Sequence, residues 1–106
     1  MYLDELNKQR EKYQTEGNIL KEIEILREIL RNNQYFDEIN ENRFVPMYLG
    51  LIVNGVVLYH VNWIDIIEKE IVFMHKNIQT HPIASLVLEN LNSLMIITND
   101  GIKEVL

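Results

Sequence analysis

Residues 48–61 read YLGLIVNGVVLYHV, two apolar runs that are joined by Asn54-Gly55. A two-residue turn that matches the twist of paired strands needs positive φ at both positions, and asparagine and glycine tolerate this best. The stretch therefore predicts a tight β-hairpin. Because nearly every other position is apolar, we expect both faces of the hairpin to be covered, one of them by helices that precede it.

On the N-terminal side, residues 1–33 predict a helical hairpin. Apolar residues recur at helical spacing in two segments: Leu3, Leu6 and Tyr13 in the first, and Ile19, Ile23, Leu26 and Leu30 in the second. Between them, Gly17 suits the left-handed position that ends a helix, and Asn18 can cap the next helix by accepting a backbone hydrogen bond.

Residues 34–46 predict a connector, because they are polar and acidic and because Pro46 rules out a continuing helix. Aromatic side chains bury area at low entropy cost, and acids can pair with a basic target. The candidate partner-binding residues are Tyr35, Phe36, Asp37, Glu38 and Glu41. In the alternative interpretation, Tyr35, Phe36 and Phe44 anchor the connector to the core while the acids face water.

On the C-terminal side, residues 47–106 predict an α+β part with two further helices. The first is indicated by Asn62 as a cap and by apolar residues at helical spacing, namely Ile64, Ile67, Ile71, Met74 and Ile78. After a turn at residues 77–80, His81-Pro82 begins a second helix that continues to residue 93. Residues 95–98, the turn at residues 99–101 and residues 102–106 then predict a second β-hairpin.

This order of elements from Asn62 onward resembles the helix-turn-helix and wing of a winged-helix domain. The resemblance implies a second helix that enters the major groove of DNA and a wing that contacts the backbone. Residues 81–93, however, contain no lysine or arginine, so we expect such a domain to bind protein. Two other interpretations remain: a plain α+β core, or a five-stranded barrel of Sm-like type, which needs Trp63 to Met74 to be strand.

Size, charge and cysteine content narrow the function classes. A chain of 106 residues without cysteine fits one domain, residues 1–106, with no disulfide and no thiolate chemistry. The net charge is −6, and residues 45–106 hold three lysines against six acids. Most of the chain is therefore expected to repel a phosphate backbone.

Catalytic and metal chemistry find little support in the sequence. All four glycines have local positions in turns or strands, so none remains for a phosphate loop. The histidines, at positions 60, 75 and 81, lack the four-residue spacing of a zinc helix, and Ser85 and Ser93 lack a nucleophile elbow. The paired acids Glu68 and Glu70 carry no assignment without a pocket. We expect no cofactor, no metal and no enzymatic activity.

The sequence therefore predicts an acidic, cytoplasmic protein-binding module: an adaptor, immunity factor or inhibitor, of phage or plasmid type, whose partner is a basic protein. We expect no signal peptide, since Tyr2 to Glu11 is charged. We also expect no membrane span, because proline, glycine and polar residues interrupt the longest uncharged stretch, residues 44–64. The alternative is a winged-helix transcriptional regulator that binds DNA as a dimer, and a homodimer is compatible with either function.

Overall fold

A computed structural model describes residues 2–76 and 81–106 of the chain. In these residues it contains two helices, α1 (Tyr2–Glu16) and α2 (Ile19–Arg31), nine strands and one short 3-10 helix, η1 (Leu88–Asn90). The strands are β1 (Phe36–Asn40), β2 (Arg43–Pro46), β3 (Gly50–Val53), β4 (Val56–Leu58), β5 (Trp63–Ile67), β6 (Glu70–His75), β7 (His81–Val87), β8 (Leu94–Thr98) and β9 (Gly101–Glu104). Among the described residues, no helix has the length and apolar character needed to cross a membrane.

The helical hairpin is confirmed, and its turn lies where the sequence places it. Gly17 has a φ of 72°, in the left-handed region, and the Asn18 side chain accepts a hydrogen bond of 3.3 Å from the backbone N–H of Lys21. This bond satisfies one of the N–H groups that the first turn of a helix leaves free. The apolar stripe of α2 is buried, including Leu26 and Leu30.

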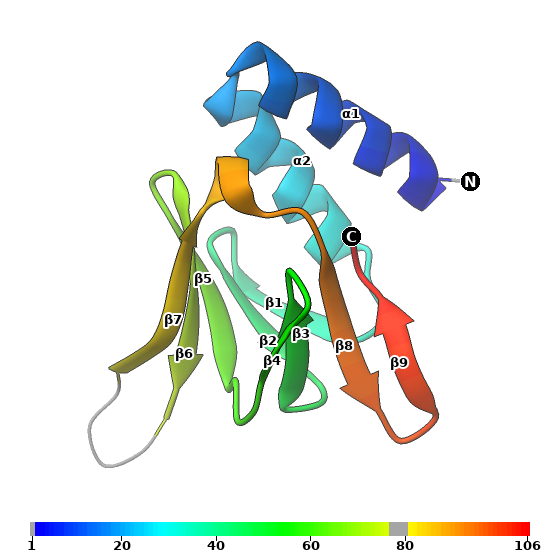
Figure 1. The fold of residues 1–106 in the computed structure, drawn as a ribbon, viewed down its shortest axis with the longest axis vertical. Coiled ribbons are helices and arrows are strands. Elements are labelled where there is room, and N and C mark those ends of the chain that lie inside the picture. The colour runs from blue at the N-terminus through cyan, green and yellow to red at the C-terminus, as the bar shows by residue number, and fades with distance from the viewer. Residues whose placement is uncertain (1, 77–80) are drawn as a thin grey trace.

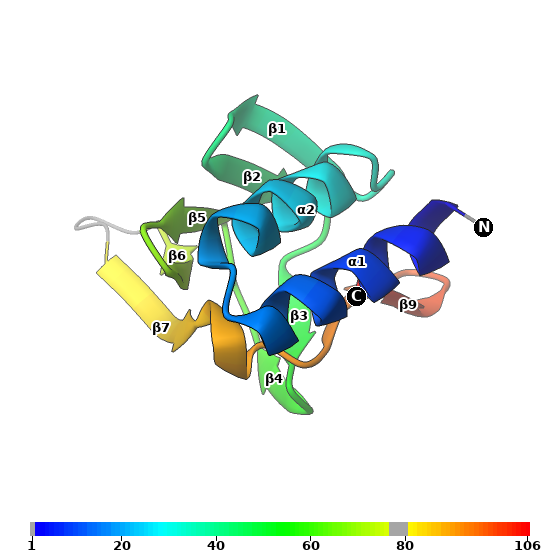
Figure 2. The same ribbon diagram turned by 90° about the horizontal axis from the view of Figure 1, so that it is seen from above.

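The strands form two antiparallel sheets that face each other beneath the helices. The five-stranded sheet has the order β1-β2-β5-β6-β7, and the four-stranded sheet has the order β4-β3-β8-β9. Figure 1 shows α1 and α2 across one end of the strands, and Figure 2 shows from above that both helices cross the space between the sheets. Side chains from both sheets and from α2 form one core, with Phe44, Phe73, Leu51, Ile96 and Leu26 fully buried.

Both hairpins that depend on a glycine turn are confirmed. In the β3–β4 turn, Asn54 and Gly55 have φ values of 50° and 80°, so both central residues are in the left-handed region that this turn needs. The β8–β9 hairpin turns at Gly101, whose φ is 112°.

The predicted connector is wrong, because residues 34–46 contain the β1–β2 hairpin. Strand β2 pairs with β5 on its other side, so the segment becomes part of the five-stranded sheet. The backbone N–H of Met47 also donates to the carbonyl oxygen of Tyr35, at 2.8 Å, which extends the pairing. Pro46 is tolerated because it lies at the end of its strand.

The helix predicted from Ile64 to Ile78 is also wrong over its described part, since β5 and β6 form a hairpin there with a turn at Glu68-Lys69. Ile78 lies outside the described residues. Ile64, Ile71 and Phe73 face the core, and their burial between two sheets outweighs the helical spacing of the isoleucines. Branched residues of this kind fit a pleated surface well, so the same sequence suits either structure.

The predicted helix over residues 81–93 is replaced by β7 and η1. Burial in β7 alternates with a period of two: Ala84 and Leu86 pack against the core, whereas Ile83 and Ser85 are exposed. Pro82 is accommodated because β7 is an edge strand and pairs only with β6. The predicted turn at residues 77–80 lies outside the described residues.

The resemblance to a winged-helix domain is therefore overturned, because its two helices are strands. The described part of residues 62–106 contains a hairpin, an edge strand and one 3-10 turn before the C-terminal hairpin. The condition of the barrel alternative is met, since β5 and β6 span Trp63 to His75. The described strands, however, form two sheets of five and four strands instead of one five-stranded barrel.

Candidate functional site

A large hollow on the described surface lies between the first half of α2 and the β5–β6 turn. It has a volume of about 970 Å³ and joins a second hollow of about 620 Å³, and residues such as Ile19, Ile67 and Lys69 line both. We call the two together the helix–strand groove. It combines residues that lie more than forty positions apart in the sequence, as Figure 1 shows by the approach of the β5–β6 turn to α2.

Apolar side chains on the two walls of the helix–strand groove are exposed. Leu20 on α2 is 75% exposed, and Ile67 at the end of β5 is 52% exposed. Leu20 lies off the apolar stripe by which α2 packs on the core. Since neither side chain is needed for packing, both are free to contact a ligand.

Carboxylates surround these apolar groups. The lining of the helix–strand groove includes six acidic and three basic residues. Glu68, Glu70 and Glu89 are exposed, and none of the three takes part in an ion pair within the described part of the chain. The groove therefore presents uncompensated negative charge beside apolar surface.

Two of the three cations in the groove are held by the protein itself. Arg43 donates from Nε and Nη2 to the two oxygens of Asp65, at 2.8 and 3.0 Å. These hydrogen bonds raise the pKa of Arg43 above its ordinary value. Arg27 donates from Nη2 to Oδ1 of Asn42, at 2.6 Å. Lys69 is the third, and it is exposed at the β5–β6 turn.

Trp63 completes the arrangement around Asp65. Its Nε1–H donates to Oδ2 of Asp65 at 3.1 Å, and the guanidinium of Arg43 lies 4.9 Å from the centroid of its ring. Asp65 thus accepts three hydrogen bonds, two from Arg43 and one from Trp63. We therefore assign Asp65 a structural role on the floor of the groove.

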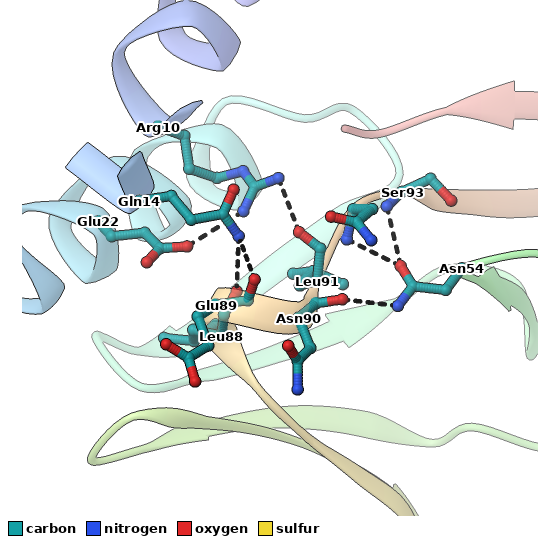
Figure 3. A network of polar contacts seen from close by, with 10 residues as sticks. Arg10, Gln14, Glu22, Asn54, Leu88, Glu89, Asn90, Leu91 and Ser93 are labelled. Carbon is teal, nitrogen blue, oxygen red and sulfur yellow. Dashed lines mark hydrogen bonds and ion pairs between the residues drawn. The ribbon is translucent and has the colours of Figure 1, made fainter. Parts of the chain in front are cut away.

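A polar network fixes the segment that carries Glu89 of the groove lining, which we call the crossover segment (residues 88–93). It connects β7 of one sheet to β8 of the other. Figure 3 shows side chains that reach it from two directions. From the helices, Arg10 Nη2 donates to the carbonyl oxygen of Leu91 at 2.9 Å, and Gln14 Nε2 donates to that of Glu89 at 2.7 Å.

From the opposite direction, Asn54 in the β3–β4 turn binds the crossover segment with both ends of its amide. Its Nδ2 donates to the carbonyl oxygen of Asn90 at 2.7 Å, while its Oδ1 accepts from the backbone N–H groups of Asn92 and Ser93 at 2.8 and 3.0 Å (Figure 3). The backbone N–H of Leu88 in turn donates to the carbonyl oxygen of Lys69, at 2.8 Å. The crossover segment thus ties the helices, the β3–β4 turn and the β5–β6 turn together.

A buried ion pair lies at the centre of this network. Arg10 Nη1 is 3.2 Å from Oε2 of Glu22, and the two residues are 4% and 2% exposed. Burial lowers the pKa of Arg10, and burial raises the pKa of Glu22, with Arg10 opposing part of that rise. The pair joins α1 to α2 and holds Arg10 in position to bind the crossover segment.

The structure separates the predicted partner-binding residues into two sets. Phe36 is buried in the core, and Tyr35 is half-buried with its ring 6.2 Å from that of Tyr48. Asp37, Glu38 and Glu41 are exposed on the β1–β2 hairpin. Glu38 forms an ion pair with Arg31, in which Oε2 of Glu38 is 2.9 Å from Nη2 of Arg31. The two aromatic side chains thus serve the fold, and the role of the three acids stays a prediction.

Two histidines that are distant in the sequence are neighbours in the structure. The rings of His60 and His75 are 6.1 Å apart, and Nδ1 of His75 is 3.0 Å from the carbonyl oxygen of His60. Within residues 2–76 and 81–106, no group of three or more histidine and acidic side chains is arranged to hold a metal ion.

Sequence reasoning missed the helix–strand groove because it placed Ile67, Glu68 and Glu70 on a helix. One signal was available: Leu20 is the single large apolar residue on the polar side of an otherwise regular amphipathic helix. Comparison with known protein families, with curated proteins and with solved structures finds no match to this chain.

Proposed function

We propose that this protein is a non-enzymatic binding module that takes a basic segment of another protein in the helix–strand groove. One observation supports the proposal above the others: exposed Leu20 and Ile67 lie in the same groove as the unpaired carboxylates of Glu68, Glu70 and Glu89. The proposal includes an adaptor, an immunity factor or an inhibitor, and a cytoplasmic protein of phage or plasmid type.

The chemistry of the groove favours lysine or arginine in the bound segment. These side chains have apolar stems that pack on aliphatic surface while their charged ends stay near carboxylates and water. The net charge of −6 would steer a basic partner toward the protein before contact. Apolar contact then contributes affinity, and the carboxylates contribute selection among partners.

The structure offers little to the alternative of a DNA-binding regulator. The segment that the winged-helix resemblance assigned to the recognition helix, residues 81–93, contains strand β7 and η1 instead. Three arginines are already ion-paired with acids: Arg10 with Glu22, Arg31 with Glu28 and Glu38, and Arg43 with Asp65. A polyanion would have to compete with these acids for the same cations.

A peptide titration followed by NMR tests the proposal. The probe is an amphipathic peptide of lysine and leucine, and the control peptide replaces each lysine with glutamate. We expect the basic peptide to shift the amide signals of Leu20, Ile67 and Glu68, and to bind more weakly as salt is added. The acidic peptide should cause no shift. Binding of mixed-sequence duplex DNA tighter than that of the basic peptide would refute the proposal.

Paired variants locate the binding surface. Glu68→Gln with Glu70→Gln should weaken binding of the basic peptide by about tenfold, equivalent to about 1.4 kcal/mol. The matched control, Asp37→Asn with Glu41→Gln, removes two charges from the β1–β2 hairpin and should leave the affinity nearly unchanged. The opposite ranking would move the site to the acids of that hairpin.

A further inference from the structure

The two sheets leave four edge strands, and three of them carry features that prevent pairing with another chain. Strand β1 contains Asp37 and Glu38 and has an irregular register beside Glu38. Strand β7 contains Pro82 and pairs with β6 through a register shift. Strand β9 contains Lys103 and Glu104. Charges, proline and bulges are the usual means by which proteins protect sheet edges.

Strand β4 is short, with three residues, but it has no charge, proline or bulge. It consists of Val56, Val57 and Leu58 and pairs regularly with β3. It lies within residues 44–64, a stretch that contains no aspartate, glutamate, lysine or arginine. Val56 and Val57 are 60% and 42% exposed. A strand paired on one side only leaves alternate backbone N–H and C=O groups facing outward.

The exposed face of the four-stranded sheet continues this apolar character. Val57 lies opposite Ile52, and Ile52 lies opposite Met95 on β8. Residues directly opposite each other in antiparallel strands share one face, so these three side chains form an apolar row, which ends at Glu104 opposite Met95 on β9. In the adjacent row, Ile97 lies opposite Ile102, which is exposed at the edge of the sheet.

We infer that β4 is a self-association surface, on which a second copy of this chain docks by antiparallel pairing of the two β4 strands. An antiparallel pair of identical strands has two-fold symmetry, so each copy supplies what the other needs. Two molecules of charge −6 repel each other, and the uncharged edge is the place where they can approach at the lowest electrostatic cost. The same lack of charge gives this edge no means to select the basic partner of the groove.

The dimer joins the two four-stranded sheets into one continuous sheet of eight strands. It also brings the two apolar rows together, so that apolar contact supplements the backbone hydrogen bonds. The helix–strand groove has no lining residue from β3, β4, β8 or β9. Each copy therefore keeps its groove open, and peptide binding and self-association fail or succeed independently.

Sedimentation of the full chain over a concentration series tests the inference. We expect a concentration-dependent dimer. Val57→Lys introduces an edge charge and should raise the dissociation constant of the dimer by at least about tenfold. The control, Ile39→Lys, adds the same charge to the exposed edge strand β1 and should leave the dissociation constant unchanged. A monomer at every concentration, or equal effects of the two variants, would overturn the inference.

Oxidative cross-linking gives a second test that does not depend on a disruptive substitution. The chain contains no cysteine, so Val57→Cys introduces a single thiol near the proposed two-fold axis with little change in side-chain volume. We expect rapid formation of a disulfide-linked dimer under mild oxidation, whereas Ile39→Cys should remain monomeric. Cross-linking of the Ile39 variant, or none for the Val57 variant, would place the contact elsewhere or exclude it.

Discussion

Arg10 and Glu22 belong to different helices and meet in an ion pair of 3.2 Å that is almost completely shielded from water. The charge of each residue is compensated mainly by the other, because Arg10 makes its only further described hydrogen bond to the carbonyl oxygen of Leu91. Removal of one partner leaves the other charge buried and unpaired, and this costs far more than removal of both.

Substitutions at this pair should therefore be strongly non-additive. Arg10→Met should lower the free energy of unfolding by about 3–5 kcal/mol, since Glu22 is left buried without its partner. The double variant Arg10→Met with Glu22→Leu should lose less than the single variant. Urea denaturation at neutral pH measures both. A double variant that loses the sum of the two single losses would show that the residues do not interact.

The raised pKa of Glu22 predicts a specific pH dependence of stability. The ordinary pKa of a glutamate is 4.5. Just above this pH, the unfolded chain releases the proton of Glu22 while the folded protein still holds it. The contribution of this proton to the free energy of unfolding is complete below pH 4.5 and is lost as the pH rises through the raised pKa of Glu22 in the folded state. Denaturation over a pH series should show this decline for the natural protein.

The variant Glu22→Gln supplies the control for that series, because it cannot titrate. Its unfolding free energy should lack the decline, so the difference between the two proteins should change with pH only within this window. Parallel curves for the natural protein and the variant would show that Glu22 titrates alike in the folded and unfolded states.

Asp65 should stabilise the floor of the helix–strand groove through Arg43 and Trp63. Asp65→Ala removes the acceptor of three hydrogen bonds and should cost about 1–3 kcal/mol, toward the lower value because Arg43 is partly exposed. Trp63 is the only tryptophan, so its fluorescence should change in the folded state as well. Asp37→Asn, at an exposed position, should change stability by less than about 0.5 kcal/mol.

Asn54 combines a backbone role with a side-chain role, and two substitutions separate them. Asn54→Gly keeps a residue that tolerates a φ of 50° but loses the three hydrogen bonds to the crossover segment. Asn54→Ala loses the same bonds and also strains the turn. We expect Asn54→Gly to cost about 1–3 kcal/mol and Asn54→Ala to cost more, by thermal or urea denaturation. Equal losses would mean that the left-handed conformation carries no penalty here.

The sequence alone predicted those elements whose ends carry a local chemical signal. The helical hairpin was recognisable from Gly17 and Asn18, and the β3–β4 and β8–β9 hairpins from Asn54-Gly55 and Gly101. The β5–β6 hairpin was missed because it turns at Glu68-Lys69, where Glu68 adopts a φ of 53° without being glycine or asparagine. Such a turn is imposed by pairing of the strands and not by the residues within it.

The candidate site was less accessible to sequence reasoning than the fold. The groove depends on contact between α2 and the β5–β6 turn, and this contact exists only once the hairpin is known. Strand β7 was missed for a related reason, since Pro82 fits the first turn of a helix and an edge strand equally well. The acids of the β1–β2 hairpin were found because their exposure follows from composition alone.

The anchoring of α1 has a consequence for the order in which the protein matures. Arg10 and Gln14 bind carbonyl groups that lie 81 and 75 residues further along the chain. While the chain emerges from the ribosome, the carbonyl groups that anchor α1 are therefore absent until synthesis has passed residue 91. Contacts of such long sequence separation form late, so we expect α1 to dock onto the crossover segment in one of the last steps of folding.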